Sequence, residues 1–275
     1  MACPAMIMRS VPLSPALSRY AAVLIDLDGT LWVGDEPCAG APGAVDAIRE
    51  ASLTVRFLTN DVRHSPEEIV RKLWRLGFRA NVGEVVSVGA ALQRRLAERD
   101  GGTAFVVGAR ALVDHVATAG LRVVNRTPFA ARADVVIVAE HDAVDYDELR
   151  TATQAVLRGA ELIGATRDAT FPMPDGPWPG SGAILAAVEA AAGRRADLVV
   201  GKPGPAMYAA AVDGVAGRVL AVGDRIEVDV AGARAAGLDA ALVLTGGASR
   251  AEAEAMAPGM RPQLVADSLA ALALI

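Results

Sequence analysis

The sequence is poor in cysteine, histidine and aromatic residues, and the first two shortages argue against a disulfide framework and a histidine metal site. Among 275 residues there are two cysteines, three histidines and 4% aromatic residues. Two cysteines are too few for a disulfide framework, so Cys38 is interpreted as an ordinary thiol. Isolated histidines do not form the clustered ligand sets of zinc sites. We therefore expect none of His64, His115 and His141 to bind a metal.

Long apolar runs and runs of basic residues are also missing from the sequence. Apolar residues make up 53% of the chain, but no uninterrupted stretch approaches the roughly 18 residues that a membrane helix needs. Residues 1–15 lack the apolar core and the cleavage site of a signal peptide. The net charge of −5 and the dispersed arginines argue against nucleic acid as the main partner. We therefore expect a globular, cytoplasmic protein with no membrane or nucleic-acid partner.

Short apolar runs that end in polar residues are the main signal of the fold. Five such runs span residues 21–25, 54–58, 198–200, 219–222 and 240–244. Continuous runs of this length are typical of strands buried on both faces of a parallel sheet. Helical patterns stand between them, with a start signal at residues 65–68 and closing glycines at Gly77 and Gly193. This alternation predicts an α/β fold with right-handed crossovers, in which ligands bind at the carboxyl ends of the strands.

The spacing of these runs predicts an inserted domain. The interval between Thr59 and Lys202 is far longer than one or two βα units require. A second set of apolar runs fills it, at residues 104–107, 121–124, 135–138 and 161–163. We therefore predict an N-terminal tail (1–17), a core (18–80 and 181–275) and an inserted α/β domain (81–180). Residues 171–182, rich in proline and glycine, are interpreted as the hinge back to the core.

Acidic residues follow two of the predicted core strands. Asp26 and Asp28 follow the first run, Asp224 follows the fourth, and Asp229 comes five residues later. Two carboxylates at the end of a buried strand are costly unless a cation compensates their charge. Mg²⁺ prefers oxygen ligands and usually binds one or two carboxylates together with substrate phosphate. The sequence therefore predicts a magnesium site, with Asp229 binding metal waters or orienting the other carboxylates.

Donor groups at two other strand ends are expected to balance these charges. Thr59 and Asn60 follow the second run, and Lys202 follows the third. Several carboxylates around one metal would repel a phosphate dianion, so a cation and hydroxyl or amide donors are needed beside them. We therefore predict that Thr59, Asn60 and Lys202 bind phosphate.

Taken in order, four segments resemble the motifs of the haloacid dehalogenase-like phosphatases. They are DLDGT at 26–30, TN at 59–60, GKP at 201–203, and GDR at 223–225 followed by Asp229. The short stretch after the first motif and the long insertion after the second resemble the subgroup with a C2-type cap. Within it the chain is similar to the NagD and 4-nitrophenylphosphatase type, which includes phosphoglycolate and glycerol-3-phosphate phosphatases. The resemblance implies a doubly wound, Rossmann-like core with a parallel sheet and an inserted C2-type cap.

The resemblance also implies a mechanism. Asp26 would attack phosphorus and form an aspartyl-phosphate, and Asp28 would protonate the leaving oxygen and later deprotonate the attacking water. The carboxylate of Asp26, the backbone carbonyl of Asp28 and Asp224 would bind Mg²⁺, while Lys202 would neutralise the transferring phosphoryl group. The implied substrates are small phosphomonoesters such as glycerol 3-phosphate, dihydroxyacetone phosphate or phosphoglycolate. The implied assembly is a homodimer through the cap.

The chain departs from the commonest family pattern in two places. Asp61 stands where many relatives have a second asparagine, and we expect it to cap or brace the loop. Arg167 stands where many relatives have an asparagine after an Ala-Thr pair. It is interpreted either as a ligand of an anionic group on the substrate or as a partner of Asp168 or Asp175. Trp32 is interpreted as packing the segment after the first motif or as stacking on substrate.

Two other functions stay open at this point. On the same scaffold a phosphotransferase or phosphomutase would pass the aspartyl-phosphate to an alcohol instead of water. A non-catalytic phosphate-binding or regulatory protein would store it, but Asp28 argues against storage because an acid/base beside an acyl phosphate promotes its hydrolysis. A Walker phosphate loop is excluded at Lys202, because the upstream glycine and the following serine or threonine are missing.

Overall fold

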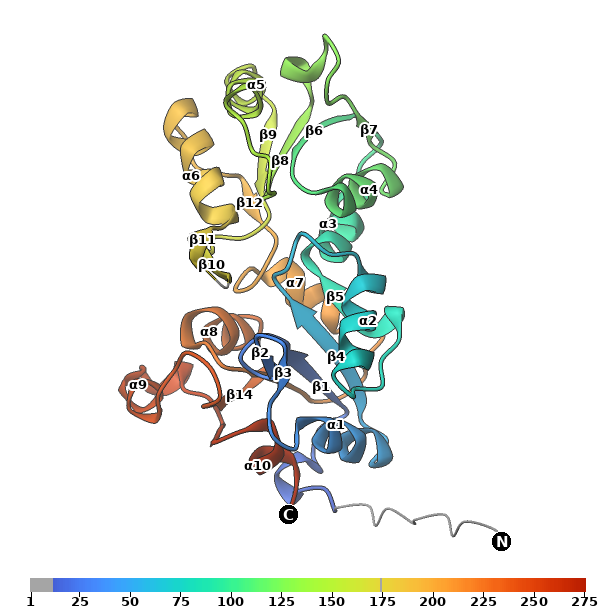
Figure 1. The fold of residues 1–275 in the computed structure, drawn as a ribbon, viewed down its shortest axis with the longest axis vertical. Helices are drawn as coiled ribbons and strands as arrows, with labels where there is room; N and C mark the ends of the chain where they lie inside the picture. The colour runs from blue at the N-terminus through green and yellow to red at the C-terminus, as the bar shows by residue number, and fades with distance from the viewer. Residues whose placement is uncertain (1–11, 174) are drawn as a thin grey trace, which may run out of the picture. The chain divides into compact units, whose positions relative to one another are not determined.

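The structure is a computed structural model that describes residues 12–173 and 175–275, and its contacts divide the chain into two units (Figure 1). Unit 1 comprises the chain up to Arg56 together with Leu73–Ala80 and Gly214–Ile275, and unit 2 comprises Phe57–Lys72 and Asn81–Asp213. Strand β4 (Thr54–Thr59) and helix α2 (Pro66–Arg75) contribute residues to both. The predicted division into a core and an inserted domain stays a prediction.

Most of the predicted N-terminal tail lies in residues 1–11, outside the described part of the chain. The prediction that this segment is no signal peptide therefore stays a prediction. Beyond this segment a short 3-10 helix, η1 (Pro15–Leu17), buries Leu17 completely. The backbone amide of Ser14 also donates to the carbonyl of Ala273 at 2.8 Å. The described end of the predicted tail is therefore packed against the rest of unit 1.

The sheet that carries the acidic residues is parallel throughout. Its order is β15-β14-β13-β1-β4, continued by β5 of unit 2. The strands are β1 (Ala22–Asp26), β13 (Val219–Gly223), β14 (Asp239–Val243), β15 (Leu264–Ala266) and β5 (Val85–Ser87). Ile25 pairs with Val222, so β1 and β13 end at the same edge. Every residue of β13 is buried, as predicted for a strand covered on both faces.

Helices and short strands complete unit 1. The strand pair β2 (Trp32–Val33) and β3 (Glu36–Pro37) is antiparallel and follows β1 closely. The helices are α1 (Ala41–Glu50), the π-helical turn η4 (Ile226–Val230), α8 (Ala231–Ala235), α9 (Arg250–Ala255), η5 (Pro258–Met260) and α10 (Leu269–Ala273).

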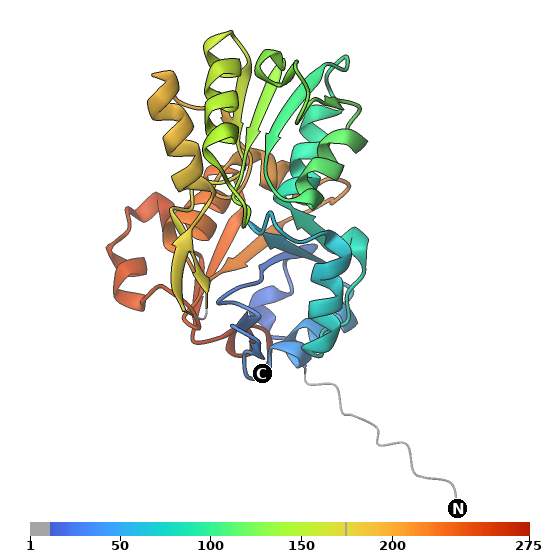
Figure 2. The ribbon, with the colours of Figure 1, turned by 45° about the horizontal axis from the view of Figure 1, so that its top comes forward.

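Unit 2 contains a second parallel sheet, in the order β12-β9-β8-β6-β7. Its strands are β12 (Leu198–Val199), β9 (Glu161–Gly164), β8 (Val135–Val138), β6 (Thr103–Val107) and β7 (Arg122–Val123). Helices α5 (Tyr146–Leu157) and α6 (Ser181–Ala192) lie on one face, and α3 (Val88–Leu96) and α4 (Arg110–Thr118) lie on the other (Figures 1 and 2). Buried apolar side chains of β6, β8 and β9 pack against α5 and α6. The remaining elements are η2 (Val82–Glu84), η3 (Ala130–Arg132) and α7 (Pro205–Ala211).

The structure differs from the sequence prediction at two segments of unit 2. Leu198–Val199 pairs with β9, so it belongs to the second sheet and not to the core sheet. The apolar pattern alone does not distinguish which of two parallel sheets a short strand joins. Residues 171–182 are more than a hinge, because β10 (Thr170–Met173) and β11 (Gly176–Pro179) form an antiparallel hairpin directly before α6. The rings of Phe171 and Trp178 meet edge to face across it.

The predicted helix signals are confirmed. Ser65 and Glu68 exchange hydrogen bonds at the start of α2, with the Ser65 amide donating to Glu68 Oε2 at 2.8 Å and the Glu68 amide donating to Ser65 Oγ at 3.3 Å. Helix α6 ends at Gly193, whose φ of 69° lies in the left-handed region that favours glycine. Among the residues that the structure describes, no helix combines the length and apolar character needed to cross a membrane.

Candidate active site

Three carboxylates gather at the carboxyl edge of the unit 1 sheet. Asp26 ends β1, Asp224 follows β13, and Asp229 lies in the π-helical turn η4. One carboxylate oxygen from each lies within 4.8 Å of the others. Asp224 and Asp229 are 5% and 4% exposed. Three carboxylates this close, two of them buried, are a donor set suited to a hard divalent cation, and we call them the acidic cluster.

Glycines leave the space that the acidic cluster occupies. A Cβ atom at Gly29 or at Gly246 would overlap the Asp224 carboxylate, and Gly29 has a φ of 80° that favours glycine in any case. The amide of Gly247 donates to Asp224 Oδ2 at 2.9 Å. Gly29 belongs to the DLDGT motif, and Gly246 and Gly247 follow the predicted strand at residues 240–244 after Thr245.

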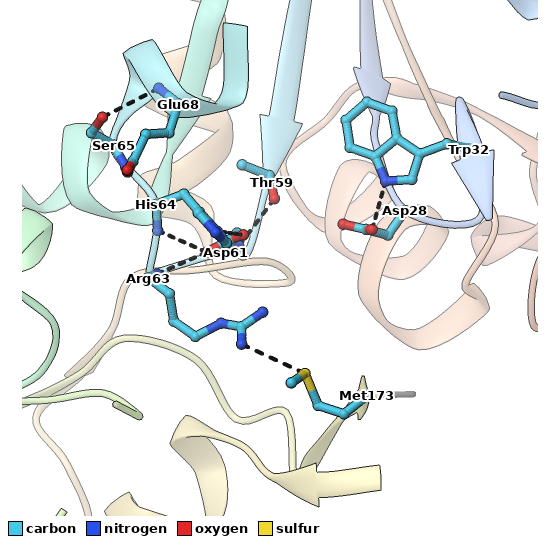
Figure 3. Close-up of polar contacts among 9 residues, drawn as sticks. All are labelled: Asp28, Trp32, Thr59, Asp61, Arg63, His64, Ser65, Glu68 and Met173. Carbon is cyan, nitrogen blue, oxygen red and sulfur yellow. Dashed lines mark hydrogen bonds and ion pairs between the residues drawn. The ribbon is translucent and has the colours of Figure 1, made fainter. Parts of the chain in front are cut away.

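Asp28 is oriented by the indole of Trp32. The Asp28 side chain is exposed, and its Oδ1 accepts a hydrogen bond from Trp32 Nε1 at 2.7 Å (Figure 3). Trp32 is 2% exposed and packs against Phe78, with ring centroids 6.4 Å apart. Trp32 therefore packs the short segment after the first motif, which was one of its two interpretations. It also fixes the rotamer of the carboxylate predicted to act as acid and base.

Lys202 and Asn60 form a second polar group, in unit 2. Asn60 Oδ1 accepts a hydrogen bond from the backbone amide of Lys202 at 2.8 Å, and Asn60 Nδ2 donates to the carbonyl of Lys202 at 3.0 Å. The same Nδ2 donates to Asp168 Oδ2 at 2.8 Å. Lys202 is 2% exposed. The Asn60 side chain thus holds Lys202, so a phosphate contact by Asn60 would have to come from its backbone amide.

Asp61 braces the loop after β4, as predicted. Its amide donates to Thr59 Oγ1 at 3.0 Å, and its Oδ1 accepts from the amides of Arg63 at 2.7 Å and His64 at 3.2 Å (Figure 3). Asp61 Oδ2 contacts His64 Nδ1 at 2.7 Å. Burial raises the pKa of Asp61, but the hydrogen bonds from His64 and the backbone outweigh it and lower the pKa overall. The same hydrogen bond raises the pKa of His64.

Arg167 is held by Glu189, a partner that the sequence did not indicate. Its guanidinium donates to both carboxylate oxygens of Glu189, at 3.2 and 2.9 Å, and Arg195 donates to the same carboxylate at 2.8 Å. Glu189 lies on α6 and is 4% exposed. The hydrogen bonds from Arg167 lower the pKa of Glu189 to about 2. Arg167 therefore ties the segment after β9 to α6, and a contact with substrate stays a prediction.

Glu140, which no motif in the sequence indicates, has a raised pKa. Burial raises it to about 7, the charge of Asp61 acts in the same direction, and the charge of Arg63 opposes it. Ser181, the first residue of α6, accepts a hydrogen bond from the Glu140 amide at 3.1 Å, and its hydroxyl donates to the Glu140 carboxylate. Because burial outweighs these hydrogen bonds, the carboxyl of the folded protein is mostly protonated below about pH 7.

Replacing Glu140 with glutamine should stabilise the protein at high pH. The folded-state pKa of about 7 lies above the usual value of 4.5, so the stability contributed by the protonated carboxyl is complete below pH 4.5 and is lost as the pH rises through 7. The unfolding midpoint of Glu140→Gln should exceed that of the wild type at about pH 8, and the difference should vanish toward pH 4.5. Thermal unfolding across this range measures it. The exposed Glu254, replaced in the same way, is the control, and a gain of equal size at both ends of the range would contradict the account.

Comparison with known proteins identifies the family. Residues 23–122 match the family model described as haloacid dehalogenase-like hydrolase, and residues 199–272 match a HAD-hydrolase-like model. The D-glycerol 3-phosphate phosphatase of Mycobacterium tuberculosis is 36% identical over 257 residues, which cover 92% of this chain and 71% of that protein.

Solved structures agree with this assignment. The glycerol phosphate phosphatase of Mycobacterium tuberculosis in complex with magnesium superposes with a TM-score of 0.88 at 34% identity, covering 95% of this chain and 78% of that one. NagD from Escherichia coli K-12 has a TM-score of 0.84 at 26% identity, covering 91% of this chain and 97% of that one. These findings confirm the predicted fold class and support the assignment as a phosphoric monoester hydrolase. The chain therefore belongs to the haloacid dehalogenase-like hydrolase family, as its four motifs indicated.

Proposed function

We propose that this enzyme hydrolyses small phosphomonoesters, with Asp26 as the nucleophile. The observation that carries the proposal is the acidic cluster, in which the carboxylate at the end of β1 lies beside two buried carboxylates. The similarity to a D-glycerol 3-phosphate phosphatase supports sugar and polyol phosphates as the substrate class. Glycerol 3-phosphate, dihydroxyacetone phosphate and phosphoglycolate are the proposed members.

The residues present fit a magnesium ion. Carboxylate oxygens within 4.8 Å of one another suit a small hard cation, and the glycines around Asp224 keep bulkier groups away from it. We propose that the carboxylates of Asp26 and Asp224 and the backbone carbonyl of Asp28 hold Mg²⁺, with Asp229 orienting them or binding metal waters. A relative of known structure was solved in complex with magnesium. When bound, Mg²⁺ would supply positive charge beside the phosphoryl oxygens.

The side chains of unit 1 divide the chemistry between them. A carboxylate oxygen of Asp26 attacks phosphorus, the bond from phosphorus to the leaving oxygen breaks, and Asp28 gives that oxygen a proton. Asp28 then takes a proton from a water that attacks phosphorus, and the bond from Asp26 to phosphorus breaks to release inorganic phosphate. The hydrogen bond from Trp32 to Asp28 limits the rotation of this acid and base.

The side chains of unit 2 are proposed to bind the phosphoryl group. Lys202 and Thr59 are 2% and 3% exposed, and the loop after Thr59 is braced by Asp61. A buried ammonium stabilises the negative charge that develops on the phosphoryl oxygens far more than one in water would. A homodimer through the inserted domain belongs to the same proposal and rests on the family resemblance, and the cytoplasmic location stays a proposal beside it.

Removal of divalent cations should abolish phosphate release, and added Mg²⁺ should restore it. Asp229→Asn should raise the Mg²⁺ concentration for half-maximal rate by roughly 10- to 100-fold, because removing a residue that orients metal ligands weakens metal affinity by that factor. Asp224→Asn should raise this concentration more, because it removes a ligand. Rates measured across a Mg²⁺ titration after chelation test this. Asp267→Asn, at an exposed carboxylate, is the control. Undiminished activity in chelator would refute the metal site.

The substrate class is tested by phosphate release from a panel of phosphomonoesters, with and without an acceptor alcohol. We expect glycerol 3-phosphate or a related small ester among the best substrates, with water as the acceptor. Transfer to the alcohol in preference to water would indicate a phosphotransferase. Tight binding of an ester without any release in the presence of Mg²⁺ would indicate a non-catalytic protein.

A further inference from the structure

We propose that Asp168 is a positioning residue for Lys202 and acts through the side chain of Asn60. The inference rests on the proposed function only in assigning Lys202 to the phosphoryl group. All three residues belong to unit 2, so their mutual geometry is described within one unit. The sequence predicted Asp168 only as a partner of Arg167, whereas in the structure its carboxylate accepts a hydrogen bond from Asn60.

Asn60 clamps the backbone of Lys202 with both ends of its amide. Oδ1 accepts from the Lys202 amide at 2.8 Å, and Nδ2 donates to the Lys202 carbonyl at 3.0 Å. Backbone hydrogen bonds continue the pairing of strand β12 as far as Gly201, whose amide donates to the carbonyl of Ala165 at 2.7 Å. The two hydrogen bonds with Asn60 then hold Lys202 itself, the point from which the lysine side chain extends.

Asp168 selects the orientation of that amide. An asparagine amide can turn over and exchange its oxygen and nitrogen, which here would leave the Lys202 amide facing a donor and its carbonyl facing an acceptor. An ionised carboxylate only accepts hydrogen bonds, and Asp168 Oδ2 accepts from Asn60 Nδ2 at 2.8 Å. The carboxylate therefore stabilises the one orientation of Asn60 that holds Lys202.

Asp168 is itself fixed by close packing. Its amide donates to Thr166 Oγ1 at 3.3 Å, and its carbonyl accepts from the amide of Gly182 at 2.9 Å. A Cβ atom at Gly180 or Gly182 would lie 2.5 or 2.8 Å from that carbonyl oxygen, so both positions need glycine. Thr166 is 2% exposed. The carboxylate thus comes from a rigid junction between β9 and the start of α6.

The position of Lys202 matters because its ammonium is proposed to stabilise the charge on the phosphoryl oxygens. A displacement of about 1 Å in a group that stabilises a transition state costs on the order of 10²-fold in rate. If Asp168 were only a local brace of its own turn, its loss would lower stability and leave the contribution of Lys202 unchanged. The two roles therefore differ in how the effect of Asp168 depends on Lys202.

A double-mutant cycle with Lys202→Ala separates these roles, with glycerol 3-phosphate and Mg²⁺ as the assay. We expect Asp168→Ala to lower kcat by roughly 10- to 100-fold with little change in KM, and to have no further effect when Lys202→Ala is present. Asp168→Asn, whose amide oxygen still accepts from Asn60, should keep kcat within about threefold of the wild type, because a neutral acceptor preserves most of a hydrogen bond. Thermal unfolding of every variant gives the separate effect on stability.

The outcomes distinguish failure of this inference from failure of the proposed function. Wild-type kcat in Asp168→Ala, or an equal loss with and without Lys202→Ala, would overturn the positioning role while hydrolysis by the wild type stands. A wild-type enzyme that hydrolyses no phosphomonoester would overturn the proposed function instead. If Asp168→Ala does not fold, Asp168→Ser replaces it, because its shorter side chain stays polar but withdraws the acceptor from Asn60.

Discussion

Replacing Asp26 with asparagine should lower the rate of phosphate release by roughly 10⁴-fold or more, the scale on which loss of a nucleophile acts. The amide has nearly the same shape as the carboxylate, so the end of β1 should keep its place in the sheet. Its nitrogen and oxygen carry no charge to attack phosphorus, and no aspartyl-phosphate can form. Steady-state release from glycerol 3-phosphate, with the unfolding midpoint as a check on folding, measures this effect.

The position of the nucleophile can be checked independently of rate. Borohydride reduces an acyl phosphate to an alcohol, so wild-type enzyme quenched during turnover should contain homoserine at position 26. The Asp28→Asn variant is the matched control, because it keeps Asp26 and should still be modified there. Substantial activity in Asp26→Asn, or homoserine at position 28 in the wild type, would remove Asp26 from the proposed role.

Replacing Lys202 with alanine should lower kcat by roughly 10²- to 10³-fold, the effect of removing one preorganised electrostatic donor. The ammonium belongs to a side chain that is 2% exposed, where charges interact more strongly than in water. Its loss should act mainly on the transition state, in which negative charge on the phosphoryl oxygens is greatest. Comparison of kcat and KM with those of the wild type measures the effect.

Lys202→Met is the control for packing, because methionine restores most of the volume without the charge. If charge is what matters, the alanine and methionine variants should be equally slow, although the methionine variant should be the more stable. Recovery of activity in Lys202→Met would show that Lys202 acts by filling space, which contradicts the proposed role.

Residues at strand ends were the part of the site that sequence could predict. Asp26 and Asp224 each follow a buried apolar run, and parallel strands that start and stop together bring such residues to one edge of a sheet. In the structure their carboxylates lie together with that of Asp229, which the sequence placed beside them and which a single π-helical turn carries. These placements follow from strand periodicity and short-range spacing, which a sequence displays directly.

Contacts between side chains far apart in the chain could not be predicted. Nothing in the sequence indicates that the Asn60 amide would hold the backbone of Lys202, or that Arg167 would pair with Glu189 on a later helix. Such contacts depend on rotamers and on the paths of loops, which carry no periodic signal. The prediction that β12 belongs to the core sheet was wrong for a related reason. The apolar pattern of a two-residue strand is too short to specify which strand it pairs with.

The stereochemical course at phosphorus tests the covalent mechanism most directly. The substrate is a phosphorothioate monoester made chiral at phosphorus by its sulfur and two oxygen isotopes, and it is hydrolysed in water of the third oxygen isotope. Two successive in-line displacements, which transfer through Asp26 requires, give retention of configuration in the inorganic thiophosphate, whereas a single attack by water gives inversion. We predict retention in the thiophosphate released by the wild-type enzyme, and inversion would contradict the aspartyl-phosphate intermediate.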